Sequence, residues 1–303
     1  MQIRASQIQI EVEDSAPQRV DLPVVLLIMG LGMQLTAWPP GFVRGLINAG
    51  YRVIRFDNRD AGLSQKFDQC GLPNLMWQGL KYKLRLAIHP PYSIRDMALD
   101  ALDVLDALAI DKAHIVGVSM GGMVAQRVAL AAPERTLSLT SVMSSSGARG
   151  LPAATPAVTR QLISRPSGKG KGAVIDHSVK LFKAIGSPGF AADDAFLRDR
   201  VTAAYERNFC PVGVARQMVA IMADAARATE LAGVDAPTLV LHGKADPLVP
   251  YACGEDTARR IPGARMVGID GMGHDLPPGV VELLLPPLLA HLSAAAPRQG
   301  QPH

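Results

Sequence analysis

The serine in Gly117-Val118-Ser119-Met120-Gly121 is the residue of this sequence best suited to nucleophilic chemistry. It lies between an apolar segment, 113–118, and a segment of helical character, 120–131. A serine on such a sharp strand-to-helix turn has its hydroxyl clear of the sheet, and small flanking residues relieve the crowding. We therefore predict that Ser119 is a catalytic nucleophile. The alternative is a glycine-rich turn that carries a passive serine.

A nucleophilic serine needs a base, and the base needs a carboxylate that orients it. Asp246 follows the apolar segment 237–241, and His274 follows the segment 265–269 in a loop made flexible by Gly271 and Gly273. The chain order serine, aspartate, histidine is the one expected for a sheet of this kind. We predict a triad of Ser119, Asp246 and His274. A turn-capping Asp246 and a surface His274 are the alternatives.

The loop Met29-Gly30-Leu31-Gly32-Met33 follows the first long apolar segment. It does not complete a dinucleotide-binding G-x-G-x-x-G pattern, because position 35 is leucine. Its glycines instead allow a backbone amide to turn toward the serine and bind an oxyanion. We predict that the Leu31 and Met120 amides form this oxyanion hole. Gly32 is an alternative donor and a candidate substrate contact. Trp38 is a candidate residue of the acyl pocket, and the alternative is an aromatic side chain of the core.

The elements that would position these residues alternate between strand and helix. Residues 8–12 alternate apolar with polar, as an edge strand with one buried face does. Ser93 and Asp96 form a capping-box pattern that opens a helix running to about residue 109. A mainly parallel α/β sheet follows from this alternation. The expected strands are 8–12, 22–29, 51–56, 113–118, 137–143, 237–241 and 265–269, and the expected helices are 42–49, 94–109, 120–131 and 280–292.

The strand–helix alternation stops between residues 149 and 229. We predict a core over 1–148 and 230–303 that is interrupted by an insertion over 149–229, and a frayed tail from Ala294. Residues 151–216 hold ten Lys and Arg against five Asp and Glu. A basic excess of this size fits either a solvated surface or a preference for anionic substrates, because charged side chains mostly stay in water.

Composition excludes several classes of protein. The 303 residues are 48% hydrophobic and 19% charged, which is too apolar for a disordered chain. A nucleic-acid binder usually has a concentrated basic face, and a net charge of only +4 is weak evidence for one, so no nucleic-acid partner is expected. No apolar run is long enough for a membrane span, and no secretory signal is evident. Three widely spaced cysteines indicate a reducing, cytoplasmic location, and no histidine pair has metal-ligand spacing, so neither metal nor cofactor is expected.

These motifs together resemble the α/β-hydrolase superfamily. The Asp57-Asn58-Arg59-Asp60 turn and the Pro91-Tyr92-Ser93 helix entry are most similar to esterases of the aclacinomycin-methylesterase type. The resemblance implies an α/β-hydrolase fold, a mainly parallel twisted sheet flanked by helices with an inserted helical cap. The hydrolase core would then comprise 1–148 and 230–303, and the helical cap 149–229. It also implies a Ser-His-Asp hydrolase without a cofactor, with Asp57, Arg59 and Asp60 stabilising a turn.

The resemblance also separates this chain from other members of the superfamily. Ser119 replaces the aspartate nucleophile of haloalkane dehalogenases, and the oxyanion loop lacks both the Ser-Gly-Pro-Gly run of carbon–carbon bond hydrolases and the His-Gly-Gly-Gly string of lipase-like esterases. We predict a serine esterase that acts on a small-molecule carboxylic ester. The alternatives are a lactonase or thioesterase with the same triad, a cofactor-free haloperoxidase, and a ligand-binding receptor on the same fold. The sequence leaves the oligomeric state open.

Overall fold

Eight strands form one sheet in the computed structural model, which describes residues 1–5 and 7–295. Their order is β1-β2-β4-β3-β5-β6-β7-β8. The first two pairings, β1 with β2 and β2 with β4, are antiparallel, and every later pairing is parallel. The strands are β1 (Gln2–Ala5), β2 (Ile8–Asp14), β3 (Val24–Ile28), β4 (Arg52–Phe56), β5 (Ala113–Val118), β6 (Thr136–Val142), β7 (Thr238–Gly243) and β8 (Arg265–Ile269).

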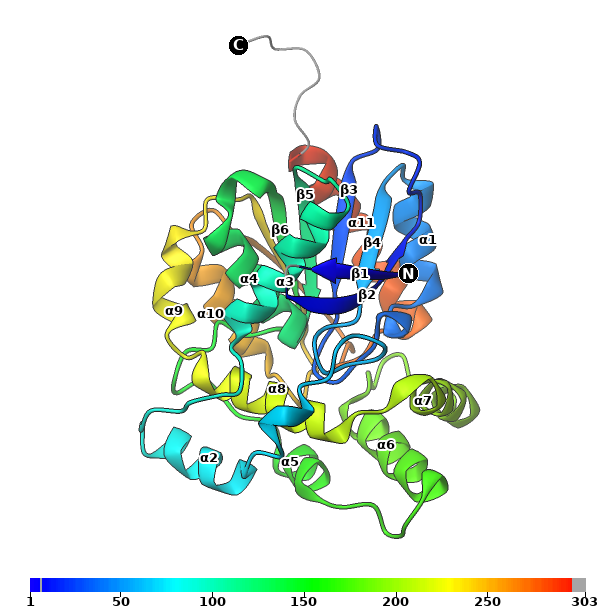
Figure 1. The fold of residues 1–303 in the computed structure, drawn as a ribbon, viewed down its shortest axis with the longest axis vertical. Coiled ribbons are helices and arrows are strands. Elements are labelled where there is room, and N and C mark those ends of the chain that lie inside the picture. Colours follow the sequence, from blue (N-terminus) through cyan, green and yellow to red (C-terminus); the bar gives the residue numbers. More distant parts are fainter. Residues whose placement is uncertain (6, 296–303) are drawn as a thin grey trace.

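Helices cover both faces of the sheet (Figure 1). The described α-helices are α1 (Pro40–Asn48), α2 (Leu75–Lys83), α3 (Ile94–Ala107), α4 (Met120–Ala131), α5 (Pro156–Ile163), α6 (Lys171–Ile185), α7 (Asp194–Asn208), α8 (Pro211–Ala223), α9 (Arg227–Glu230), α10 (Tyr251–Arg260) and α11 (Pro278–Ala295). Four short 3-10 turns connect them, at Leu35–Ala37, Asp68–Cys70, Pro133–Arg135 and Leu231–Gly233. This mainly parallel sheet with flanking helices confirms the predicted fold class.

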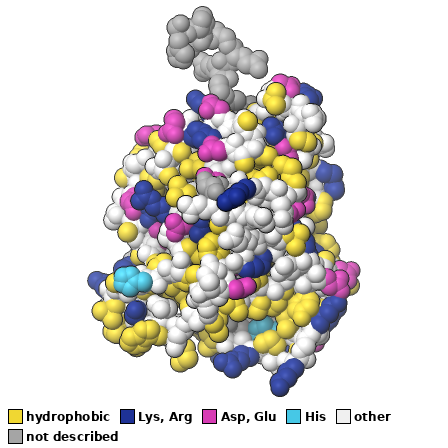
Figure 2. Space-filling view, in the orientation of Figure 1, with side chains coloured by type: hydrophobic (Ala, Val, Ile, Leu, Met, Phe, Trp, Pro, Cys, Tyr) yellow, Lys and Arg dark blue, Asp and Glu magenta, His cyan; other side chains and the backbone are white. Residues whose placement is uncertain are grey.

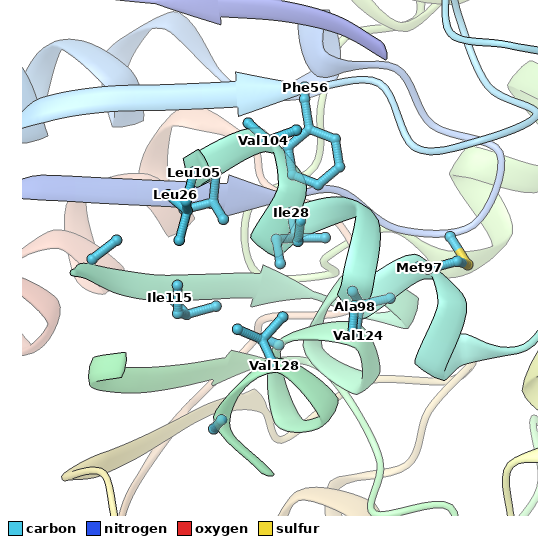
Figure 3. Close-up of a cluster of buried hydrophobic side chains, with 14 of the residues drawn as sticks. Leu26, Ile28, Phe56, Met97, Ala98, Val104, Leu105, Ile115, Val124 and Val128 are labelled. Carbon is cyan, nitrogen blue, oxygen red and sulfur yellow. The ribbon is translucent and has the colours of Figure 1, made fainter. Parts of the chain in front are cut away.

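Two hydrophobic clusters form the core, one on each face of the sheet. The first joins β3 and β5 to α3 and α4, and Figure 3 shows Leu26, Ile28 and Ile115 facing Val104 and Val124. The second joins the opposite face to α1 and α11. All five residues of β3 are buried, because a central parallel strand is covered on both faces. The α3 helix begins with the predicted capping box, in which Ser93 and Asp96 satisfy each other's amides.

The N-terminal edge of the sheet differs from the prediction. Residues 8–12 were expected to form an edge strand, but β1 pairs antiparallel with β2 and occupies the edge instead. The predicted one-sided burial of β2 is confirmed, with Ile8, Ile10 and Val12 buried. The prediction that residues 8–12 form the edge was wrong because the segment 2–5 is too short and too polar to show a strand pattern.

α11 is the one helix of the described residues that is long and apolar enough, by length and composition alone, to cross a membrane. Its Leu284, Leu288 and Leu292 are completely buried in the second hydrophobic cluster. The helix packs on β6, β7 and α1. These leucines therefore belong to the hydrophobic core. The predicted fraying was placed from Ala294 onward, and all but two residues of that stretch lie outside the described part of the chain.

Between residues 149 and 230 the chain forms helices α5 to α9 and no strand. Helices α5 to α8 lie together with α2 at one end of the sheet, in the lower part of Figure 1. α2 and α10 were not among the expected helices. The turn after β5 and the loops after β7 and β8 carry the candidate site residues, since the carboxyl ends of parallel strands meet at one edge of a sheet.

Candidate active site

Ser119 occupies a strained turn between β5 and α4. Its φ of 55° and ψ of −121° are unusual for a residue with a side chain. Such a conformation costs about 1–3 kcal/mol and persists only where the surroundings enforce it. The flanking glycines allow it, because a β-carbon on Gly117 would lie 2.1 Å from the Gly121 carbonyl oxygen, and one on Gly121 would lie 2.1 Å from the Ile28 carbonyl oxygen. The spacing of the motif therefore follows from backbone contacts on both sides of the serine.

His274 lies between Ser119 and Asp246 in an unbroken chain of hydrogen-bonding distances. Its Nε2 is 3.0 Å from the Ser119 Oγ, and its Nδ1 is 2.7 Å from the Asp246 Oδ2. All three side chains come from the carboxyl ends of parallel strands, β5, β7 and β8. The imidazole and the carboxylate are buried. The arrangement allows the serine hydroxyl to transfer its proton to the imidazole while the carboxylate orients the ring.

The loop after β7 holds the Asp246 carboxylate in place. The Leu248 and Val249 amides donate to its Oδ1 at 2.9 and 2.8 Å. The other oxygen is thereby left to face His274. His242 supports the same loop, because its Nε2 lies 2.8 Å from the Val249 carbonyl oxygen. Burial lowers the pKa of His242, so the ring remains neutral 3.6 Å from Asp246.

The loop that carries His274 is held from the segment after α6. The His274 amide donates to the Ile185 carbonyl oxygen at 2.7 Å, and the Gly273 amide donates to the Ser187 Oγ at 2.8 Å. The Gly189 amide donates back to the Gly271 carbonyl oxygen at 2.9 Å. Residues 185–189 therefore set the height of the imidazole above the sheet.

Two backbone amides beside Ser119 are free to bind an oxyanion. Across the described residues, neither the Leu31 nor the Met120 amide has a hydrogen-bond acceptor in the protein. The Gly32 amide is engaged, because it donates to the Gln217 Oε1 at 2.8 Å. The Gln217 Nε2 in turn donates to the Arg59 carbonyl oxygen at 2.8 Å. This geometry favours Leu31 over Gly32 as the second donor.

The two candidate substrate contacts, Trp38 and Gly32, lie in different surroundings. Trp38 is completely buried and stacks on Phe42 of α1 at a centroid distance of 5.2 Å. This is the core position that was the alternative to a pocket position, and its indole Nε1 has no hydrogen-bond partner among the described residues. Gly32, with a φ of +66°, faces Val214 of α8, whose Cγ2 would lie 2.5 Å from an added β-carbon.

The turn after β4 joins the core to α7 and α8. Asp57 accepts the Leu35 and Leu63 amides at 2.6 and 2.8 Å, and it pairs with Arg207 at 2.7 Å. Asp57 therefore stabilises its own turn, as predicted for it, and also binds a helix about 150 positions away.

Asp60 makes the second of these connections. It forms a bidentate ion pair with Arg216 at 2.7 Å, and both side chains are fully buried. It also accepts the Tyr92 hydroxyl and the Phe67 amide. Burial alone would raise the pKa of Asp60, but these hydrogen bonds outweigh it and hold that pKa below its ordinary value. Arg59 points elsewhere and pairs with Asp100 at 2.6 Å.

Sequence reasoning missed the polar residues of the helical segment that contact the site. Gln217, Arg216 and Arg207 lie more than 140 positions from their partners in the chain. No local pattern marks such a residue, because its role depends on which loop the helix packs against. Two buried polar residues side by side in the apolar α8 were the one available signal. Within the described residues, no group of three or more His, Cys, Asp or Glu side chains could hold a metal ion.

Comparison with known proteins gives consistent matches over most of the chain. Residues 23–277 match the family described as the alpha/beta hydrolase fold. The chain is 32% identical to the rhodomycin D methylesterase DauP of Streptomyces sp. (strain C5), over 91% of this chain and 92% of that protein. It is 31% identical to the rhodomycin D methylesterase DnrP of Streptomyces peucetius, with the same coverage.

Solved structures show the same fold at lower identity. The enol-lactonase of Burkholderia xenovorans LB400 superposes with a TM-score of 0.72 at 21% identity, covering 97% of this chain and all of that one. A meta-cleavage product hydrolase of Pseudomonas fluorescens IP01 gives a TM-score of 0.73 at 20% identity, covering 98% of both chains. At these identities the likeness establishes the arrangement of the elements.

Proposed function

This chain belongs to the alpha/beta hydrolase family, and we propose that it cleaves carboxylic esters through a covalent acyl-enzyme on Ser119. The two methylesterase relatives align over nine-tenths of both chains, and this similarity supports the assignment as a carboxylic ester hydrolase. The observation that carries the catalytic assignment is the chain of distances from Ser119 through His274 to Asp246, 3.0 and then 2.7 Å.

In the first half of the reaction, the Ser119 Oγ attacks the ester carbonyl carbon while His274 Nε2 takes its proton. The negative charge that develops on the carbonyl oxygen is bound by the Leu31 and Met120 amides. The tetrahedral intermediate then collapses, and His274 returns the proton to the leaving alcohol. Asp246 accepts a hydrogen bond from the Nδ1–H group throughout, which keeps the proton on Nδ1 and leaves Nε2 free to act as the base.

In the second half, a water molecule attacks the acyl carbon and gives its proton to His274. The acid leaves when Ser119 recovers that proton, so the enzyme is restored without an external reagent. We expect the alcohol part of the substrate to be small, in line with the methylesterase relatives. Residues 149–229 would act as the cap that selects the acid part, because the amide of Gly32 and the loop of His274 are both bonded to that segment.

We place the enzyme in the cytoplasm, where its three free cysteines would stay reduced. The test is a panel of esters that share one acyl group and differ only in the alcohol, beside the lactone and thioester of comparable size. Methyl esters should give the highest kcat/KM, with methanol released in equal amount to the acid. A lactone or thioester preference would move the assignment to that class, and absence of any turnover would favour a binding protein.

The nucleophile is tested in the same assay with Ser119→Ala. This variant should lower kcat by about 10⁴-fold or more, since no other group is placed to form the acyl-enzyme. Covalent labelling by a fluorophosphonate should disappear with it. Labelling at full strength in a folded Ser119→Ala protein would identify another serine as the nucleophile.

A further inference from the structure

One short stretch of this protein exposes an unusual amount of apolar surface. Of the seventeen large hydrophobic side chains that are exposed among the described residues, seven lie between positions 72 and 86. Met76 is 89% exposed and Trp77 is 50% exposed. Single exposed apolar residues are ordinary, but a contiguous group marks an interaction site. The group consists of Leu72, Leu75, Met76, Trp77, Leu80, Leu84 and Leu86.

These side chains are not required by the core of the protein. α2 is a well-formed helix whose first turn is capped by Asn74, which accepts the Trp77 amide at 3.0 Å. None of its residues is buried, although the helix packs along α8. Met76, Leu80 and Leu84 recur every fourth residue and so share one side of the helix. The apolar side of α2 is therefore open to a partner.

The same region is uniformly basic. Residues 69–95 contain four Lys and Arg and no Asp or Glu. Residues 149–175 contain five Lys and Arg, again with no acidic residue. Arg149 connects the two segments, since its Nη1 donates to the Tyr82 carbonyl oxygen at 3.1 Å and its guanidinium lies 5.3 Å from the Tyr82 ring centre. Figure 2 shows yellow apolar side chains with dark blue basic ones at the lower left, where Figure 1 places α2.

We propose that residues 72–86, with Arg149, form a surface that docks on an anionic lipid layer; this surface is called the α2 surface below. A helix with Trp, Leu and Met on one side and Lys and Arg beside them suits the boundary between headgroups and acyl chains. Lys81 Nζ lies 5.8 Å from the Trp77 ring centre, so the cation and the aromatic ring would lie at a similar depth in the lipid layer. The contact is peripheral, and no part of α2 crosses the layer.

Two other occupants fit the chemistry less well. A second copy of this chain would bring the same basic residues face to face in a twofold contact, because such an interface is self-complementary. Single-stranded nucleic acid binds basic grooves through stacked aromatic side chains, whereas the α2 surface offers mainly aliphatic ones. An anionic lipid layer satisfies the charge and the apolar side chains together.

Docking would also bring the lipid layer close to the catalytic machinery. α8 packs against α2, and its Gln217 holds the Gly32 amide beside the oxyanion loop. One helix thus separates the α2 surface from that loop. This proposal does not depend on which ester the enzyme cleaves, so it can fail while the proposed function stands.

The test is sedimentation of the full chain with vesicles of phosphatidylcholine alone or mixed with phosphatidylglycerol. Binding should require phosphatidylglycerol and weaken with salt. A charge variant, Lys81→Gln with Lys83→Gln and Arg85→Gln, should lower the partition coefficient by about 10²-fold, at roughly fivefold per charge. An apolar variant, Met76→Ser with Trp77→Ala and Leu84→Ser, should lower it to a similar degree.

Matched controls separate the α2 surface from general surface chemistry. The first control, Arg4→Gln with Arg44→Gln and Lys112→Gln, removes three exposed charges elsewhere on the protein. Each of the two controls should bind vesicles within about twofold of the wild type. The second control, Ile47→Ser with Leu99→Ser and Leu283→Ser, removes exposed apolar side chains from α1, α3 and α11. Hydrolysis of a water-soluble ester should be unchanged in all four variants.

Tryptophan emission gives a second readout. The chain has two tryptophans, and Trp38 is completely buried, so a blue shift on adding vesicles reports Trp77 and should vanish in Trp77→Phe. The proposal is overturned if anionic vesicles fail to bind the wild type, or if the apolar variant binds like the wild type. It is also overturned if light scattering shows a dimer that the apolar variant dissociates.

Discussion

The Gly32 amide donates a hydrogen bond of 2.8 Å to the side-chain oxygen of Gln217, which lies 185 positions later in the chain. This contact ties the loop after β3 to α8. It occupies the amide that could have competed with Leu31 for an oxyanion, because Leu31 and Gly32 are adjacent in the same turn. Gln217 acts as a positioning residue in this arrangement, since its partners are the loop amide and the Arg59 carbonyl oxygen.

Gln217→Met should therefore lower kcat by about tenfold or more with little change in KM, because the lost contact matters most when the oxyanion forms. The variant keeps the volume of the side chain and removes both hydrogen bonds. Binding of a trifluoromethyl ketone, which mimics the tetrahedral intermediate, should weaken in proportion to kcat. Gln126→Met is the matched control, since Gln126 is equally buried but binds Ser141 and Arg227. Equal kcat losses in the two variants would show a merely structural role.

Gly32→Ala tests the approach of α8 to the same loop. The residue has a φ of +66°, and an alanine β-carbon would lie 2.5 Å from the Val214 Cγ2. We expect the variant to lose about 1–3 kcal/mol of stability from backbone strain, with a further loss from the overlap. Adding Val214→Ala to the Gly32→Ala protein should recover only the stability lost to the overlap. Denaturant unfolding of the three proteins measures both parts, and full recovery in the double variant would exclude backbone strain.

Asp246→Asn separates the candidate catalytic acid from the acids of the turn after β4. The amide would favour the wrong imidazole tautomer, so kcat should fall by about 10⁴-fold while the fold is preserved. Asp60→Asn should leave kcat within about tenfold of the wild type. Measurements belong at matched folded fractions. Near-wild-type turnover in Asp246→Asn with loss in Asp60→Asn would reverse the assignment.

Asp60→Asn should instead lower the stability of the protein. It would leave the fully buried Arg216 without its bidentate partner, and removing one member of a buried ion pair costs about 3–5 kcal/mol. Because the pKa of Asp60 is held below its ordinary value, this contribution is complete above about pH 4 and is lost as the pH falls through the lowered value. Unfolding at pH 7 and at successively lower pH checks both statements, and a flat difference between variant and wild type would contradict the second.

His114 should make the stability of the protein depend on pH at less acidic values than Asp60 does. Burial, and then the nearby His291, lower the pKa of His114 to about 4. The unfolded chain therefore binds a proton that the folded chain refuses between about pH 6.5 and pH 4, so stability falls as the pH drops through this window. The loss is on the order of 3 kcal/mol, from about 1.4 kcal/mol for each pKa unit.

The measurement for His114 is the slope of unfolding free energy against pH in the wild type and in His114→Gln. The variant should be less stable at pH 7, because it loses the contact between Nδ1 and the Ser138 Oγ at 2.8 Å. Its slope between pH 6.5 and pH 4 should nonetheless be shallower. A parallel slope would assign the effect to another buried group.

The sequence alone was sufficient for the parallel sheet and for the order of the residues along its carboxyl edge. Apolar runs such as 113–118 and the helix 120–131 were predicted with the bounds that the structure shows, because burial on both faces requires continuous apolar side chains. Ser119, Asp246 and His274 could be named because each lies in the turn or loop that follows a parallel strand. A parallel sheet brings such positions together whatever lies between them.

Only the tertiary structure decided how the inserted segment meets that edge. Three hydrogen-bonded contacts join parts of the chain that are far apart in sequence: Gln217 with Gly32, Arg216 with Asp60, and Ile185 with His274. A side chain in a helix shows no local sign of the loop it will reach, so these contacts and the choice between Leu31 and Gly32 were open. The apolar side of α2 was equally hidden, since only the packed molecule shows which hydrophobic residues the core leaves exposed.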